Sequence, residues 1–129
     1  MSKPHVVSAS CAASACVFDT CETGWGDCGT GAGCETAVNT VQNCGACGSN
    51  CDTLLANTAT TACNGTSLSC EVATCDTGYG NCDDMHATGC ETALNTTSNC
   101  GACGAACNLA NALPTCGGMP GARVCQIAG

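Results

Sequence analysis

Residues 33–51, GCETAVNTVQNCGACGSNC, decide the fold of this chain, because nearly the same stretch returns at residues 89–107 as GCETALNTTSNCGACGAAC. Fourteen of the nineteen positions are identical, and every cysteine is in register. The property that repeats is therefore the spacing of the cysteines and not a hydrophobic pattern. This spacing indicates a tandem array of a disulfide-linked module.

The 18 cysteines of the 129-residue chain form two rows of eight and a final pair. They are Cys11, Cys16, Cys21, Cys28, Cys34, Cys44, Cys47 and Cys51; Cys63, Cys70, Cys75, Cys82, Cys90, Cys100, Cys103 and Cys107; and Cys116 with Cys125. The final pair matches the opening pair of each row. The spacing predicts an amino-terminal tail (1–10), two cysteine-rich repeats (11–62 and 63–115) and a carboxy-terminal half-repeat or cap (116–129).

Large apolar side chains are scarce, and only Phe18, Trp25 and Tyr79 are aromatic. At roughly 25 cal/mol per Å² of buried apolar area, burial falls short of the entropy lost on ordering the chain. Disulfides, worth on the order of 2–4 kcal/mol each, supply the difference. We predict a small disulfide-rich fold of tandem repeat modules, with short β-hairpins and mostly irregular loops.

Local signals indicate where the regular structure lies. The Asn64-Gly65 step between two short strand-like runs predicts a β-hairpin. The matching segments at 16–18 and 124–127 indicate that each cysteine repeat begins with a short strand pair. The Gly-rich segments 21–34 and 44–51 are typical of turns. Residues 53–62 and 108–113 fit either one helical turn or a linker.

Charge and cysteine content restrict the compartment and the partners. Abundant disulfides indicate an oxidising compartment, hence a secreted or cell-surface protein. Ten carboxylates oppose only Lys3 and Arg123, for a net charge of −8, which disfavours nucleic acid and anionic membranes. No stretch approaches the roughly 18 apolar residues of a membrane span. The amino end lacks the apolar core of a signal peptide, so we expect a leader outside this sequence or another export route.

The strings CETGWGDC (21–28), GCET (33–36) and NCGACG (43–48) resemble the cysteine-rich tandem repeats of large secreted proteins in myxobacteria and related bacteria. This resemblance extends from Cys16 to Cys125 and implies a secreted, modular protein. The NCGACGxxC part is also similar to the Stig1-type domain of secreted plant proteins. The adjacent cysteine pair of that family is absent here, so its partners do not carry over.

The spacing of Cys44, Cys47 and Cys51, repeated at Cys100, Cys103 and Cys107, is also typical of metal sites. A zinc ribbon needs a second CxxC some 15–20 residues on, and an iron–sulfur cluster needs a fourth thiolate. A redox CxxC needs a helix start in a strand–helix–strand frame. The sequence shows none of these features, so structural disulfides are the leading interpretation, with metal binding and thiol redox chemistry as alternatives.

Five carboxylates recur in the Gly-rich loops and are candidate calcium ligands: Glu22, Asp27, Glu35, Asp76 and Glu91. Oxygen donors on such loops are typical of calcium sites. Alternatively, these carboxylates accept backbone N–H bonds in turns. Trp25 and Tyr79 occupy one shared position of the two rows, and such rings either stack on a sugar or cover a disulfide. Trp25 and Tyr79 are therefore candidate carbohydrate-binding residues.

Neither His5 nor His86 has neighbours that would hold it as a catalytic base. We therefore expect no enzyme and no resident cofactor. The leading hypothesis is a non-catalytic extracellular structural protein, a disulfide-stapled spacer, stalk or filament subunit whose partners are neighbouring repeats or further copies of itself. The alternative is a calcium-dependent adhesion or carbohydrate-binding module.

Overall fold

The structure, a computed structural model, describes residues 4–30 and 33–128, and for residues 15–19 it describes the backbone alone. The chain forms two compact units. Unit 1 comprises Met1–Cys51 and Ala62–Cys70, and unit 2 comprises Asp52–Thr61 and Glu71–Gly129. Both units consist of short two-stranded hairpins and loops, which confirms the predicted small disulfide-rich fold.

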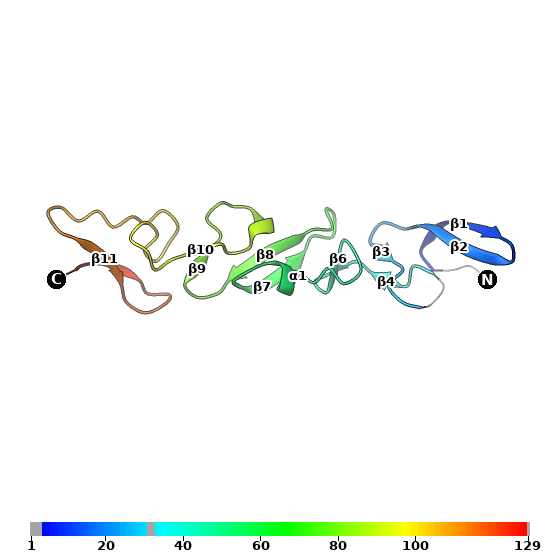
Figure 1. The fold of residues 1–129 in the computed structure, drawn as a ribbon, viewed down its shortest axis with the longest axis horizontal. Helices are drawn as coiled ribbons and strands as arrows, with labels where there is room; N and C mark the ends of the chain where they lie inside the picture. The colour runs from blue at the N-terminus through cyan, green and yellow to red at the C-terminus, as the bar shows by residue number, and fades with distance from the viewer. Residues whose placement is uncertain (1–3, 31–32, 129) are drawn as a thin grey trace. The chain divides into compact units, whose positions relative to one another are not determined.

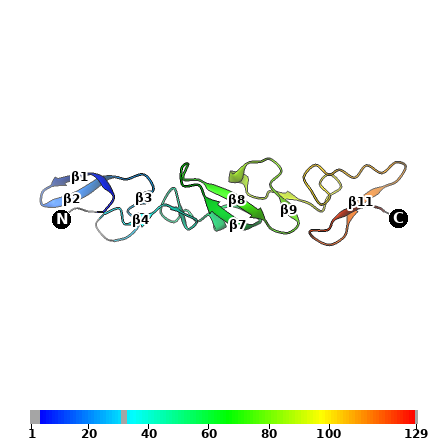
Figure 2. The same cartoon turned by 180° about the vertical axis from the view of Figure 1, so that it is seen from behind.

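Three hairpins carry the opening cysteine pairs of the sequence rows (Figure 1). They are β1 (Val6–Ala12) with β2 (Ala15–Cys21), β7 (Thr58–Cys63) with β8 (Cys70–Cys75), and β11 (Pro114–Gly117) with β12 (Val124–Ile127). Cys11 lies opposite Cys16 in the first ladder, and Cys116 lies opposite Cys125 in the last. The strand pair that the sequence predicts at the start of each cysteine repeat is therefore present, and β7 and β8 lie side by side in both views (Figures 1 and 2).

The Asn64-Gly65 step forms the turn of the middle hairpin, as predicted. The Asn64 side-chain oxygen accepts the backbone N–H groups of Thr66 at 2.9 Å and of Ser67 at 3.0 Å. The Asn64 carbonyl accepts the N–H of Leu68 at 2.8 Å. Asparagine is favoured in turns because its side chain can replace a backbone acceptor in this way. The loop therefore turns the chain from β7 into β8.

Two-residue strands pair within the loops, and of those described, β3 (Trp25–Gly26) is the one that lies wholly inside a segment predicted to form turns alone. The pairs are β3 with β4 (Thr36–Ala37), β5 (Asn39–Thr40) with β6 (Asn43–Cys44), and β9 (Tyr79–Gly80) with β10 (Thr92–Ala93). The loops also repeat their backbone hydrogen bonds. The N–H of Gly45 donates to Val38 at 2.8 Å, and that of Gly101 donates to Leu94 at 2.9 Å. The sequence repeat is therefore also a repeat of backbone conformation.

Of the two segments predicted as a helical turn or a linker, the first differs from both alternatives and the second is a linker. Residues 53–62 contain no helical turn of their own, since α1 (Cys51–Leu54) ends early and β7 follows. The β-branched threonines of that segment favour a strand. Residues 108–113 contain no helix and connect as a linker with one turn. The only other helical turn of the described residues is η1 (His86–Thr88), a 3-10 turn in the insertion of the second row.

The amino-terminal segment 4–10 is part of unit 1 and not the predicted tail, while residues 1–3 lie outside the described residues. Residues 6–10 belong to β1. Ahead of the strand, the carbonyl of His5 accepts the N–H of Glu22 at 2.8 Å, and that of Pro4 accepts the N–H of Cys34 at 3.3 Å. Asn57 and Ala56 make the matching bonds in unit 2. The segment therefore has a structural role that its counterpart repeats.

The buried core consists mainly of half-cystines. Among the described residues, the buried side chains are Cys34, Val38, Cys44, Cys51, Leu55, Cys90, Cys100 and Cys107, and none is polar or charged. Glycines let the chain approach this core closely. A Cβ on Gly26, for example, would lie 3.0 Å from Cγ1 of the buried Val38. Disulfides thus supply the packing that large apolar side chains supply in other domains.

Candidate functional site

Eight disulfides of the described residues repeat a single pairing pattern. In the first row they are Cys21–Cys34, Cys28–Cys47, Cys44–Cys63 and Cys51–Cys70; in the second they are Cys75–Cys90, Cys82–Cys103, Cys100–Cys116 and Cys107–Cys125. Cys11 is also disulfide-bonded, whereas the side chain of Cys16 lies outside the described residues. No described cysteine is a free thiol.

The bridges cross the boundaries between the sequence repeats. Cys63 and Cys70, which open the second row, bond back to Cys44 and Cys51 of the first row. The predicted boundary between residues 62 and 63 therefore falls inside strand β7, and the tip of the β7–β8 hairpin belongs to unit 1. The boundary predicted between residues 115 and 116 is crossed in the same way by the bridges Cys100–Cys116 and Cys107–Cys125. We call each of these two places a junction.

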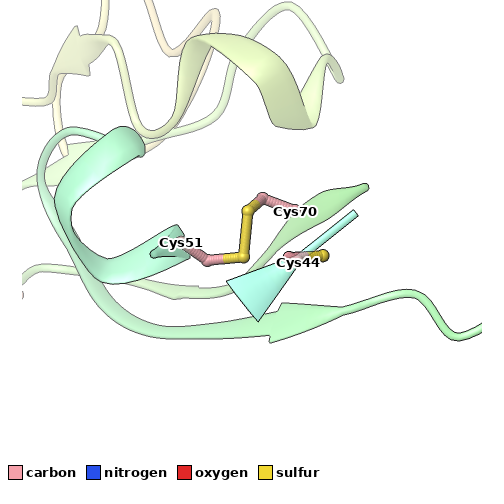
Figure 3. Close-up of side chains that lie close together, drawn as sticks. All are labelled: Cys44, Cys51 and Cys70. Atoms are coloured by element: carbon pink, nitrogen blue, oxygen red, sulfur yellow. A yellow bond between two sulfur atoms is a disulfide. The ribbon is translucent and has the colours of Figure 1, made fainter. Parts of the chain in front are cut away.

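Each junction brings two disulfides next to each other. The sulfur atoms of Cys44, Cys51 and Cys70 all lie within 4.8 Å of one another (Figure 3). The sulfur atoms of Cys100, Cys107 and Cys125 lie equally close at the second junction. All six sulfur atoms are held in disulfides.

The C-x2-C-x3-C spacing, which is typical of metal sites, does not correspond to these sulfur clusters. Cys47 and Cys103, the middle residues of the two C-x2-C-x3-C stretches, bond to Cys28 and Cys82 instead. The sulfur atoms that meet come from one row and from the hairpin that follows it.

A glycine at each junction admits a backbone carbonyl of the hairpin. Gly45 has a φ of +80°, and a Cβ there would lie 2.3 Å from the Leu68 carbonyl oxygen. Gly101, with a φ of +81°, faces the Arg123 carbonyl oxygen in the same way, at 2.7 Å. Glycine meets both requirements, because it has no Cβ and adopts positive φ without strain. The CGACG motif therefore positions the hairpin as well as supplying cysteines.

Two of the candidate calcium ligands accept backbone hydrogen bonds in matching loops. Glu35 Oε1 accepts the N–H of Gly29 at 2.7 Å, and Glu91 Oε1 accepts the N–H of Cys82 at 2.9 Å. These bonds fit the alternative that the sequence left open, in which the carboxylates stabilise turns.

The five candidate calcium ligands are not brought together. Glu22 Oε2 lies 2.9 Å from His5 Nδ1, while Asp27 and Asp76 are exposed. Within the part of the chain that the structure describes, no three carboxylate or histidine side chains converge as metal ligands would. A calcium site built from these residues stays a prediction, and the positions of their side chains give it no further support.

Hydrogen bonds hold the pKa of Glu91 below the ordinary value of a glutamate. The Thr92 hydroxyl is the main cause, followed by the N–H of Glu91 itself, while desolvation acts in the opposite direction. A lowered pKa in the folded state stabilises the fold above the unfolded-state pKa of about 4.3. This stabilisation is lost as the pH falls through the lower, folded-state pKa.

We therefore expect Glu91→Gln to melt below the wild-type chain at pH 7 and together with it in strong acid, where Glu91 is itself neutral. Melting temperatures measured from pH 7 to pH 2 test this prediction. Asp84→Asn, which removes an exposed carboxylate nearby, is the matched control and should show no such pH-dependent difference. A Glu91→Gln deficit that persists in acid would contradict the assignment to ionised Glu91.

The two candidate carbohydrate-binding rings have different surroundings. The Trp25 ring is stacked on the His5 ring, with centroids 3.5 Å apart and planes 5° from parallel. The Tyr79 side chain is 39% exposed. Sequence reasoning missed the His5 contact, because it assigned His5 to a tail. A signal was available, since His5 precedes Cys11 by the same interval as Asn57 precedes Cys63, and both residues have a φ of 55°.

The fold and the bridges define a small disulfide-rich protein whose modules are joined covalently at two junctions. So many disulfides imply an oxidising environment. No helix of the described residues is both long and apolar enough to cross a membrane. Comparison with protein-family models, with curated proteins and with solved structures finds no match.

Proposed function

We propose that the protein is a non-catalytic extracellular structural protein, a disulfide-stapled spacer, stalk or filament subunit. Its partners in this proposal are neighbouring repeats or further copies of the chain. The observation that supports this function most strongly is the overlap of the disulfide loops. The first cysteine of each bridge precedes, in the sequence, the second cysteine of the bridge before it. This overlap runs from Cys21 to Cys70 and again from Cys75 to Cys125.

The overlap shortens the covalent path that would carry a pulling force. From Cys21 to Cys125 this path follows residues 21–28, 47–51, 70–82 and 103–107, and it crosses four bridges. At roughly 3.5 Å per residue the path is about 115 Å long when taut, whereas the same segment without bridges reaches about 360 Å. A chain of this kind resists extension even where its hairpins open.

The scarcity of large apolar side chains is consistent with the same role. Half-cystines fill most of the core, and cross-links restrict the unfolded chain. A fold held in this way resists heat and proteolysis. The geometry does not favour the adhesion alternative, because Glu22, Glu35 and Glu91 already bind groups of their own chain.

Pulling on a single molecule through cysteine-free tags at the two chain ends tests the proposal. We expect the oxidised chain to stop extending early, and a reductant to lengthen the taut chain by about 250 Å. Unreduced molecules that extend as far as reduced ones would contradict the view that the bridges carry the pulling force.

A further inference from the structure

The two adjacent disulfides of each junction have a chemical consequence that is independent of the proposed spacer role. We propose that each junction is a thiol–disulfide exchange site, at which a dithiol reductant that opens one bridge releases both cysteines of the hairpin. At the first junction the relay residue is Cys44, and the released residues are Cys63 and Cys70. At the second junction Cys107 relays, because its partner Cys125 is exposed whereas Cys116 is half-buried, and Cys116 and Cys125 are released.

Accessibility sets the direction of the first step. At the first junction the loop cysteines Cys44 and Cys51 are 5% and 0% exposed, whereas their hairpin partners are half-buried. At the second junction Cys100 and Cys107 are each 7% exposed, while Cys116 is half-buried and Cys125 is exposed. An incoming thiolate therefore reaches the hairpin sulfur first and displaces the buried loop sulfur.

The short distances between the sulfur atoms determine the second step. When a dithiol attacks Cys63, the Cys63–Cys44 bond breaks and Cys44 leaves as a thiolate, which lies within 4.8 Å of both sulfur atoms of the Cys51–Cys70 bridge (Figure 3). Attack of a thiolate on one sulfur of a disulfide displaces the other. Attack of Cys44 on Cys51 forms a Cys44–Cys51 bond and expels Cys70 as a thiolate. The second thiol of the reductant then closes its own disulfide and frees Cys63.

The atoms and electrons of this sequence balance. One dithiol loses two electrons and becomes a cyclic disulfide, and the protein ends with one disulfide and two thiols where it had two disulfides. Both thiols lie on the β7–β8 hairpin, at Cys63 and Cys70. A single reduction event therefore disconnects this hairpin from the preceding row, although two bridges hold it there.

The variant Cys63→Ser tests the relay without any reductant, because it leaves Cys44 as the one unpaired cysteine beside an intact bridge. The variant is incubated at pH 8 for hours, the timescale of uncatalysed rearrangement. It is then quenched in acid, labelled with a maleimide in denaturant, reduced, labelled with a second alkylating agent and mapped by mass spectrometry. We expect the first label to shift from Cys44 to Cys70, whereas label on Cys51 would mean that Cys44 had bonded to Cys70 and kept the hairpin attached. Cys125→Ser, which leaves Cys107 unpaired, should shift it from Cys107 to Cys116.

The matched control is Cys103→Ser, which leaves Cys82 unpaired. Cys82 belongs to neither sulfur cluster of the described residues, so its label should stay on Cys82. A first label that stays on Cys44 in Cys63→Ser would overturn the proposal. Label spread over all cysteines in the control as well would also overturn it, since exchange would then be general.

The wild-type chain gives a second measurement that does not depend on the folding of a variant. With less than one equivalent of dithiothreitol, the first thiols to appear should be the hairpin pairs Cys63 with Cys70 and Cys116 with Cys125. First thiols on the two partners of one native bridge, such as Cys44 with Cys63, would show that the bridges open independently, and the relay would be wrong.

Discussion

Replacing Cys51 and Cys70 together by alanine is expected to destabilise unit 1 more than the loss of any other bridge in that unit. The bridge closes a loop of sequence separation 19, and a loop of that length contributes about 3 kcal/mol to stability. Cys51 is also fully buried, so its loss removes packing on the order of 1–2 kcal/mol. The free energy of unfolding should therefore fall by about 4–5 kcal/mol.

The control is the double variant Cys28→Ala with Cys47→Ala. That bridge has the same sequence separation of 19, but both of its cysteines are exposed. It should lose the loop contribution alone, about 3 kcal/mol. Guanidinium unfolding followed by the fluorescence of Trp25, the one tryptophan of the chain, reports on unit 1 in both variants. Equal losses would contradict the view that the junction bridge is also part of the core.

Gly45→Ala is expected to have the next largest effect on stability, because the substitution both strains the backbone and creates a steric clash. A positive φ of +80° costs a residue with a Cβ on the order of 1–2 kcal/mol. The new Cβ would also lie 2.3 Å from the Leu68 carbonyl oxygen, so the hairpin tip must move away from the bridges that hold it. We expect a total loss of about 3 kcal/mol in the free energy of unfolding.

Gly48→Ala separates the two contributions within the same motif. Gly48 has a φ of +74° and nothing within 4 Å of its added Cβ, so it should lose the conformational part alone. The second junction repeats the pair, with Gly101 close to a carbonyl and Gly104 open. A Gly45→Ala variant as stable as Gly48→Ala would show that the hairpin does not sit tightly on the glycine.

Sequence reasoning predicted the fold class because cysteine content and the shortage of large apolar residues determine it together. The Asn64-Gly65 turn was predictable as well, since its side-chain hydrogen bonds are local. The strand at residues 58–62 was missed, because it depends on pairing with β8. The amino-terminal segment was missed for the same reason, since its hydrogen bonds reach Glu22 and Cys34.

The disulfide pairing was beyond the sequence, because eight cysteines alone allow 105 pairings and no local rule selects among them. The structure shows that opening pairs bond backward. This choice is non-local, since it depends on the hairpin tip resting against Gly45 or Gly101.

The candidate site shows the same division between local and distant contacts. The turn-stabilising alternative for Glu35 and Glu91 followed from their place in the loops, and the hydrogen bonds agree with it. The stacking of His5 on Trp25 joins residues 20 positions apart, and the sulfur clusters join different rows. Neither is visible from spacing within one row.

The central claim is that disulfides join each row to the hairpin that opens the next, and disulfide mapping of the unreduced protein tests it most directly. Partial reduction and cyanylation of the intact chain, followed by cleavage and mass spectrometry, assigns each bridge. The structure predicts the bonds Cys44–Cys63 and Cys51–Cys70, with Cys100–Cys116 and Cys107–Cys125 as their repeats. A map in which Cys63 and Cys70 bond only to each other or to later cysteines would contradict it.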